Sequence, residues 1–385
     1  MIQHFFSKTD KLLALEEQYK RHQLDALTWK PVNKAPVVTG VTWLGVLGAA
    51  VYDQDLSDYR ADYPYFEQYA DPRKMFESAM QCADYYRFSC IGRIPTLKVQ
   101  IENIVQSMFG ARVFVPDNAK LKSEVFCSPV QMNLRQLLDN GKPDLQAGLL
   151  PKTLDFLTYF QNHLPEGYYI EPPPTHGPVQ VLNDVLGEQL FTEFYNAPDD
   201  VKIALQWIAD IIAEIILQFR SVCNYKDTVY YTGGSAKPGI QIDGDAIINL
   251  PPDMIQEFEM PAITQISKSI GEKIFYHYCP NPKDTRESYA GHPLPVIFEN
   301  ENILGFNSQP MGYWVYQDHF DTLKDKQIGI ESHKYLPKDH TRQEFIKWIE
   351  KMHEETYGKS GIVLTLRNII SQEELNIFND VWNKI

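Results

Sequence analysis

The chain has 385 residues, with 36 Lys and Arg against 50 Asp and Glu, which gives a formal net charge of −14 at pH 7. Hydrophobic residues make up 44% of the sequence and aromatic residues 12%, so the composition excludes an extensively disordered chain. The acidic balance also argues against a nucleic-acid-binding protein, because such a protein needs a basic face to displace the counterions of the phosphates.

Two apolar stretches resemble membrane-spanning segments, but neither has the properties of one. Residues 38–52 are too short, since a spanning helix needs about 20 apolar residues, and residues 203–219 contain Asp210 and Glu214. The first residues lack the basic and apolar regions of a signal peptide. Five irregularly spaced cysteines indicate no disulfide framework. We therefore expect a cytoplasmic protein with no membrane segment.

Short β-rich runs alternate with long helical patterns along the chain. Residues 1–35 predict an N-terminal helical extension that packs outside a main domain of residues 36–385. The candidate strands of that domain are Pro36–Val41, Tyr86–Gly92, Tyr168–Glu171, Thr228–Thr232, Lys273–Cys279, Ile303–Asn307, Gln327–Glu331 and Ile362–Leu366. Strands that alternate with helices indicate a parallel sheet. Eight such units predict an α/β fold, a single (β/α)8 TIM barrel.

One segment departs from this alternation. In Ala111–Cys127, two β-rich runs flank Pro116, Asp117 and Asn118. Turn-forming residues between two strand-like runs predict a hairpin or an elaborated loop.

Barrel enzymes carry their chemistry at the carboxyl ends of the strands, so the residues that follow each run are the candidate site residues. In chain order these residues are Trp43, Arg93, His176, Asp243, Asp245, Tyr276, His277, Cys279, Asn307, Glu331, His333 and Thr365. Among them, we expect Trp43, His176, Tyr276 and Asn307 to contact substrate.

The most specific pattern is His277-x-Cys279. Alternate residues of a strand face the same side, so the imidazole and the sulfur are predicted to lie together. Both groups suit zinc. The alternative is a hydrogen-bonded core histidine beside a small buried cysteine.

Two further pairs of ionisable residues accompany this motif. Asp243 and Asp245 flank Gly244, and they either position substrate or follow ordinary turn chemistry. Glu331 and His333 form either a second set of metal ligands, an acid–base pair or part of a solvated loop.

A family resemblance rests on the stretch from Ile240 to Cys279. It contains Asp243-Gly244-Asp245, then Asn249-Leu250-Pro251-Pro252-Asp253-Met254, then Glu257-Phe258 and Pro261, and it ends in His277-x-Cys279. This order resembles the uroporphyrinogen decarboxylase superfamily, which includes cobalamin-dependent methyltransferases that act on methylated corrinoid proteins and thiols. The resemblance implies a TIM barrel and a Zn²⁺ ion held by His277 and Cys279, with Glu331, His333 or Asp243 to complete the ligand set. It also implies that Asp243 and Asp245 are catalytic residues that position the substrate.

The sequence departs from the family pattern in three places. Residues 42–48 lack the arginines with which the decarboxylases grip their substrate. Pro280 replaces the glycine after His-x-Cys. No cysteine follows Cys279, and Thr365 stands near the place of the later cysteine ligand of the zinc methyltransferases.

Three functions follow from this resemblance. The first is zinc-assisted methyl transfer between a corrinoid and a thiol acceptor, with a small molecule or a corrinoid protein as substrate. The second is decarboxylation of uroporphyrinogen or a related acid, which needs no cofactor. The third is a non-catalytic barrel that binds a corrinoid or another ligand. The sequence is compatible with a monomer and with a homodimer.

Overall fold

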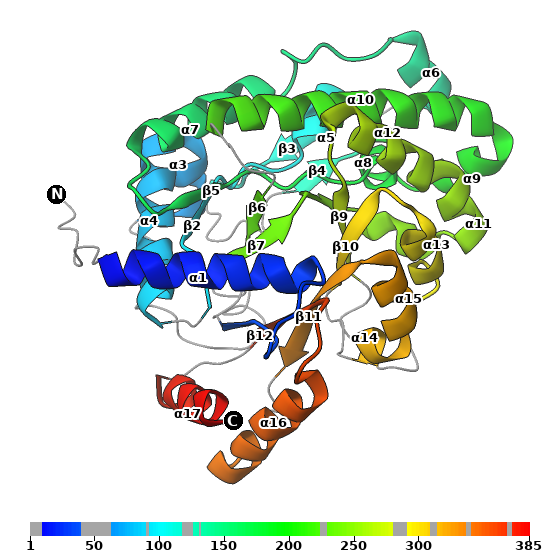
Figure 1. Ribbon diagram of the computed structural model, residues 1–385. Helices are drawn as coiled ribbons and strands as arrows, with labels where there is room; N and C mark the ends of the chain where they lie inside the picture. Colours follow the sequence, from blue (N-terminus) through cyan, green and yellow to red (C-terminus); the bar gives the residue numbers. More distant parts are fainter. Residues whose placement is uncertain are drawn as a thin grey trace.

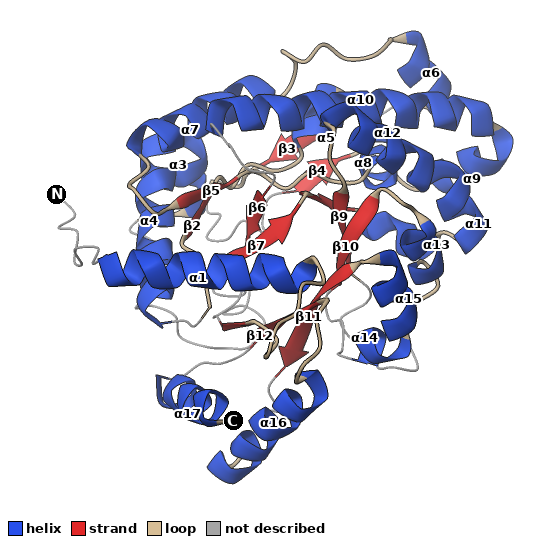
Figure 2. Ribbon diagram, viewed as in Figure 1, coloured by secondary structure: helices blue, strands red, loops and turns tan. Residues whose placement is uncertain are grey.

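The computed structural model describes residues 10–39, 63–89, 92–117, 126–130, 132–223, 229–279, 291–308, 314–335, 340–367 and 372–385. Short strands lie in the middle of the molecule and helices surround them (Figures 1 and 2). The strands are β1 Val37–Thr39, β2 Thr96–Lys98, β3 Arg112–Phe114, β4 Phe126–Ser128, β5 Tyr169–Glu171, β6 Val229–Thr232, β7 Ser235–Pro238, β8 Ile240–Asp243, β9 Ile274–Tyr278, β10 Ile303–Ser308, β11 Gly329–Tyr335 and β12 Ile362–Arg367.

The helices fill most of the intervals between the strands. They are α1 Asp10–Leu27, α3 Tyr65–Ala70, α4 Pro72–Ser89, α5 Ile104–Met108, α6 Leu134–Asp139, α7 Leu150–His163, α8 Pro178–Leu186, α9 Gln189–Asn196, α10 Pro198–Cys223, α11 Pro252–Met254, α12 Met260–Ile270, α13 Leu294–Glu299, α14 Trp314–Asp318, α15 Phe320–Lys326, α16 Arg342–Thr356 and α17 Gln372–Lys384. A 3₁₀ helix, η3 (Asp245–Asn249), follows β8, and a π-helical turn, η4 (Ile255–Glu259), lies between α11 and α12.

Eight parallel strands form the central layer. Six of them make one sheet in the order β1-β12-β11-β10-β9-β8, and β2 pairs with β5 in a second parallel sheet. A single bridge between His176 and Asp243 joins the segment after β5 to β8. The predicted α/β fold with a mostly parallel sheet is confirmed. Within the described segments, however, the ladders do not close into a complete barrel, because no ladder joins β1 to β2.

Burial on both faces explains the apolar strands. All five residues of β9 are buried, as expected for a parallel strand covered by helices on one side and by other strand residues on the other. The long helix α10 packs against α7 and α12, and its buried residues include Ile208, Ile212 and Phe219. This helix contains the apolar run 203–219. No helix in the described ranges has both the length and the apolar character that a membrane crossing requires.

Helix α1 closes the amino end of the sheet. It contacts β7, β11 and β12, and the Gly361 N–H before β12 donates to the Ala26 carbonyl at 2.8 Å. A Cβ atom at Gly329, the first residue of β11, would lie 2.3 Å from the Leu27 carbonyl oxygen, so this close approach requires glycine. The predicted N-terminal helix is therefore present, while the division at residue 35 stays a prediction.

One predicted strand is wrong, and a second is present but is not part of the parallel sheet. Residues 86–89 belong to α4, because Met75, Ala79 and Ala83 are buried at a helical spacing that continues the helix through the aromatic run. The second parallel strand is instead the short β2. The run Thr228–Thr232 supplies β6, but β6 pairs antiparallel with β7 around Gly233 and Gly234, both of which have positive φ.

The parallel strand is instead β8, which follows β7 in a segment where no strand was predicted. Its four residues alternate between buried and half-buried, which gives only a weak strand signal. The hairpin predicted for Ala111–Cys127 is confirmed, since β3 and β4 pair antiparallel.

Candidate metal site

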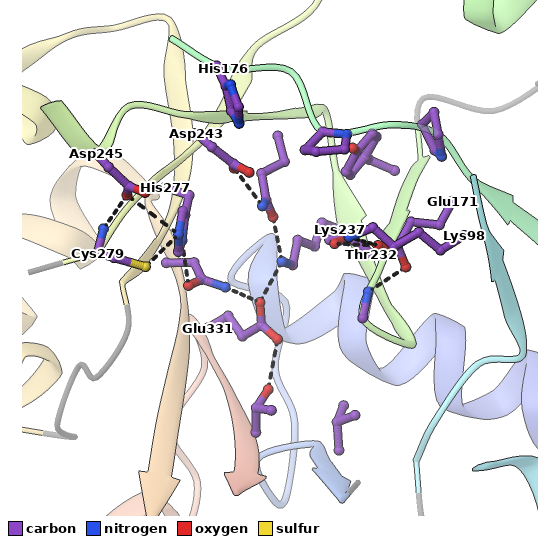
Figure 3. Close-up of a pocket in the computed structure, with 18 of the residues that line it drawn as sticks. Lys98, Glu171, His176, Thr232, Lys237, Asp243, Asp245, His277, Cys279 and Glu331 are labelled. Carbon is purple, nitrogen blue, oxygen red and sulfur yellow. Dashed lines mark hydrogen bonds and ion pairs between the residues drawn. The ribbon is translucent and has the colours of Figure 1, made fainter. Parts of the chain in front are cut away.

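A cavity of about 340 Å³ lies at the carboxyl ends of the parallel strands (Figure 3). It is lined by residues from β2, β5, β8, β9, β10, β11 and β12 and from the β6–β7 hairpin. Its charged residues are Arg93, Lys98, Lys237, Glu102, Glu171, Asp243, Asp245 and Glu331. The position of this cavity agrees with the sequence-based expectation that strand ends carry the chemistry.

Three side chains of metal-ligating types meet at one end of the cavity. Ligand atoms of Asp245, His277 and Cys279 all lie within 4.8 Å of one another. His277 Nε2 is 3.1 Å from Cys279 Sγ and 3.9 Å from Asp245 Oδ1. Nitrogen, sulfur and carboxylate oxygen at this spacing are a donor set that suits zinc. His277 and Cys279 therefore lie on the same side of the strand, as predicted.

The register of β8 and β9 brings Asp245 to this pair. Asp243 lies opposite His277 in the parallel ladder, and the Gly244 N–H donates to the His277 carbonyl at 2.7 Å. The Cys279 N–H then donates to Asp245 Oδ1 at 2.5 Å. A Cβ atom at Gly244 would lie 1.9 Å from the Tyr276 hydroxyl oxygen, so only glycine lets the chain turn here. The strand end therefore holds the carboxylate in place through backbone contacts.

The electrostatics of His277 reflect its buried acidic surroundings. Burial lowers the pKa of His277, but the charge of Cys279, its hydrogen bond, and the nearby Asp243 and Asp245 together raise that pKa to about 10. The raised pKa favours the protonated imidazole of His277 when no metal is bound. Because zinc ligands must be deprotonated, a metal would displace this proton.

Behind His277 a hydrogen-bonded network runs across the sheet. His277 Nδ1 lies 3.0 Å from Asn307 Oδ1, and Asn307 Nδ2 donates to Glu331 Oε2 at 2.5 Å. The Lys237 ammonium lies 2.6 Å from the same Glu331 oxygen. Thr365 donates its hydroxyl to Glu331 Oε1 at 2.7 Å. These residues form a continuous polar layer under the metal-binding end.

Glu331 itself does not belong to the three-residue group. Its two oxygens are taken by Asn307, Lys237, Ser235 and Thr365. The expectation that Glu331 is a ligand therefore has no support in the geometry. For His333 the structure gives the backbone position, in β11 opposite Thr365, and its side chain lies outside what is described.

The other predicted site residues divide into two groups. Asp243 and His176 line the cavity, where Asp243 Oδ1 accepts from Gln241 Nε2 at 2.8 Å, and Gln106 Nε2 lies 2.8 Å from His176 Nδ1. Asn307 also lines the cavity. Trp43 lies outside the described residues.

Tyr276 corrects a prediction, because it is fully buried and faces away from the cavity. Strand alternation explains this placement, since His277 takes the inward position. The Tyr276 hydroxyl donates to Glu259 at 2.8 Å, and the Val179 N–H donates to the other Glu259 oxygen at 2.9 Å. Burial raises the pKa of Glu259 to about 7, against these two hydrogen bonds, which lower it.

Three polar residues of functional interest were missed by the sequence analysis. Glu259 occupies a core position between Ile255 and Ile263 at helical spacing, and that signal was available in the sequence. Lys237 and Gln241 have no such signal, because their position depends on how the β6–β7 hairpin folds back. Lys237 Nζ donates to Gln241 Oε1 at 2.7 Å.

The far end of the cavity holds a second buried carboxylate. Lys98 Nζ lies 3.2 Å from Glu171 Oε1, and the Gly233 N–H donates to Glu171 Oε2 at 2.8 Å. Figure 3 shows Glu171, Lys98 and Thr232 on the opposite side of the cavity from Asp245 and Cys279. A ligand in the cavity would therefore meet donor atoms for a metal at one end and an ion pair at the other.

No protein-family model matches the sequence, and no curated protein is significantly similar to it in sequence. Among solved structures, the chain is similar to a methyltransferase from Methanosarcina mazei, with a TM-score of 0.63 and 14% sequence identity. The match covers 95% of this chain and 98% of that chain. Similarity at this identity shows a shared fold alone. It supports a TIM-barrel-like arrangement of the parallel strands, while membership of the uroporphyrinogen decarboxylase superfamily stays a prediction.

Proposed function

We propose that the protein is a methyltransferase built on a (β/α)8 barrel, in which Asp245, His277 and Cys279 hold a zinc ion that activates a small thiol acceptor. A corrinoid would supply the methyl group. The observation that carries this proposal is the convergence of one nitrogen, one sulfur and one carboxylate oxygen at the carboxyl end of the parallel strands. The fold shared with a methyltransferase supports the choice of reaction.

The three residues fit a catalytic zinc site better than a structural one. Catalytic sites have three protein ligands and leave the fourth position open, whereas structural sites have four protein ligands. The Asp245 side chain is 49% exposed and Cys279 is half-buried, so a further ligand can enter from the cavity. Zinc in such a site lowers the pKa of a thiol bound to it, which makes the thiolate available at neutral pH.

Charge in the cavity also favours a bound cation. Five carboxylates and three cationic side chains line its described part, so the lining is net negative before the Cys279 thiolate is included. Two of the cations are already paired, Lys98 with Glu171 and Lys237 with Glu331. A dication at the Asp245 end would compensate the charges of Asp243 and Asp245.

The size of the cavity bears on the two substrates. At about 340 Å³ it is at the small end of ligand cavities, which suits a small acceptor. A corrinoid ring is far larger than this cavity. The methyl donor, either a free corrinoid or one bound to a partner protein, would therefore approach from the open side. Asn307 would hold the His277 ring, and Asp243 and His176 would contact the acceptor.

The same features disfavour the decarboxylase alternative. An eight-carboxylate tetrapyrrole would enter a cavity of limited volume that is lined by more acids than bases. Like charges brought together in a partly buried site repel strongly. We therefore place decarboxylation behind methyl transfer.

The test is a zinc and activity measurement on matched cysteine variants. We expect purified wild-type protein to bind one zinc ion per chain, and Cys279→Ala to lose both zinc and methyl transfer from methylcobalamin to a thiol. Cys127→Ala is the control, since Cys127 is a free cysteine on β4 away from the lining of the cavity. Zinc that survives in Cys279→Ala, or a zinc-loaded wild type that transfers no methyl group to any thiol, would contradict the proposal.

A further inference from the structure

We propose that Glu331 selects the metal-binding nitrogen of His277 by fixing the orientation of the Asn307 amide. This inference rests on the proposed zinc site and makes Glu331 and Asn307 positioning residues of that site. The chain of contacts is short. Glu331 Oε2 binds Asn307 Nδ2 at 2.5 Å, and Asn307 Oδ1 lies 3.0 Å from His277 Nδ1.

The first step is the charge state of Glu331. Its side chain and that of Lys237 are only 6% and 3% exposed, and the two lie 2.6 Å apart. A carboxylate paired this closely with an ammonium is ionised, and an ionised carboxylate can only accept hydrogen bonds. The hydroxyls of Ser235 and Thr365 both donate to the second oxygen, which agrees with an accepting group.

The second step follows for Asn307. Facing an acceptor, the amide must present its NH₂ group, so its carbonyl oxygen faces His277. The reverse orientation would set the Asn307 oxygen against the Glu331 carboxylate in a buried place, where unmet polar groups are most unfavourable. The chemistry of Glu331 thus decides an assignment that distance alone leaves open.

The third step reaches the metal end. An oxygen opposite Nδ1 requires that Nδ1 carry the proton, which leaves the Nε2 lone pair for the metal. Nε2 is the nitrogen that lies 3.1 Å from Cys279 Sγ and 3.9 Å from Asp245 Oδ1. Partners behind metal-binding histidines commonly fix the tautomer in this way, and their loss lowers metal affinity by about 10–100-fold.

The experiment measures zinc affinity by chelator competition for three variants. Asn307→Leu removes the oxygen opposite Nδ1, and we expect zinc to bind about 10–100-fold more weakly. Glu331→Gln keeps an oxygen that can accept from Asn307 and Lys237, so we expect an affinity close to that of the wild type. The double variant Lys237→Met/Glu331→Met removes the ion pair without stranding a charge, and we expect it to fold and to bind zinc as weakly as Asn307→Leu.

A second readout separates positioning from a general loss of structure. In the Co²⁺-loaded proteins, we expect the sulfur-to-cobalt charge-transfer band of Cys279 to persist in Asn307→Leu while the ligand-field bands shift. Nitrogen-15 NMR of histidine-labelled, zinc-loaded wild type should show a proton on His277 Nδ1. An unprotonated Nδ1 in the wild type, or wild-type zinc affinity in Asn307→Leu, would overturn the inference.

The two proposals fail differently. If the wild type binds no zinc, the proposed function is wrong. The positioning role then has no metal ion to act on and is wrong as well. If zinc binds through Cys279 but Asn307→Leu binds it equally well, only the positioning role is lost.

Discussion

Two buried carboxylates that line the cavity each pair with a lysine, yet they serve different purposes. Glu331 lies 2.6 Å from Lys237, and both side chains are almost fully buried. Glu171 lies 3.2 Å from Lys98, whose side chain is 17% exposed, and it also accepts from the Gly233 N–H. The first pair leads through Asn307 to His277, and the second ties β5 to the β6–β7 hairpin.

The difference shows that what lies next to an ion pair decides its role. Glu331 binds side chains that bind a candidate ligand, so its effect passes to the metal end. Glu171 binds a backbone N–H and a lysine that is 17% exposed, so its effect stays with the hairpin. Replacement of the Glu331 side chain by an apolar one should therefore lower both the free energy of unfolding and the zinc affinity. Loss of the Glu171 carboxylate should lower the free energy of unfolding alone.

The largest effect is expected for Glu331→Met. The change leaves the Lys237 ammonium buried without its carboxylate, which typically costs about 3–5 kcal/mol of the free energy of unfolding. Denaturant unfolding of the single variant, of Lys237→Met/Glu331→Met and of the wild type measures this cost. Recovery of most of the stability in the double variant is the expected sign that a stranded charge is the cause. A single variant as stable as the wild type would show that the pair is not buried as described.

The next effect concerns Glu259, a third buried carboxylate, whose described contacts are neutral donors. Its pKa is raised from 4.5 to about 7, so the folded state favours the protonated form. The resulting stabilisation is complete below about pH 4.5 and is lost as the pH rises through about 7. Full loss amounts to about 3 kcal/mol at most. Unfolding free energies at pH 5 and pH 8 should differ less in Glu259→Gln than in the wild type, and an unchanged difference would contradict the assignment.

A smaller loss is expected for Glu171→Gln. The variant keeps one oxygen for the Gly233 N–H but weakens the contact with Lys98, so we expect a loss of about 1–2 kcal/mol in the free energy of unfolding. Zinc affinity should stay at the wild-type value, because Glu171 lies at the far end of the cavity. A drop in zinc affinity comparable to that of Asn307→Leu would show that the contacts of Glu171 also influence the metal site.

The smallest effect is expected for Thr365→Val. This change deletes one hydroxyl that donates to Glu331 Oε1 at 2.7 Å, while Lys237 and Asn307 keep the other oxygen. We expect a loss of about 1 kcal/mol in the free energy of unfolding and a zinc affinity near that of the wild type. Loss of zinc in this variant would instead indicate that Thr365 takes the place of a ligand.

The sequence predicted the fold where the strand signal was long and apolar. The buried runs that became β9, β10 and β12 were found, since each has several β-branched or aromatic residues in a row. The strands β2 and β8 were missed, because their sequences, Thr-Leu-Lys and Ile-Gln-Ile-Asp, contain no two apolar residues in a row. Only pairing with neighbouring strands makes them strands at all.

The candidate site was predictable only as far as local geometry reaches. Strand alternation placed His277 and Cys279 on one side and should also have turned Tyr276 away from the cavity. The contact of Asp245 with this pair, and the distance of Glu331 from it, depend on the register between strands. Register comes from tertiary packing, so no spacing within one segment of the sequence contains it.

X-ray absorption spectroscopy at the zinc edge tests the central claim most directly. For the zinc-loaded wild type without a thiol, we predict one sulfur neighbour at about 2.3 Å and nitrogen or oxygen neighbours at about 2.0–2.2 Å, with the sulfur absent in Cys279→Ala. A shell without sulfur, or one that is the same in both proteins, would contradict a zinc site formed by Asp245, His277 and Cys279.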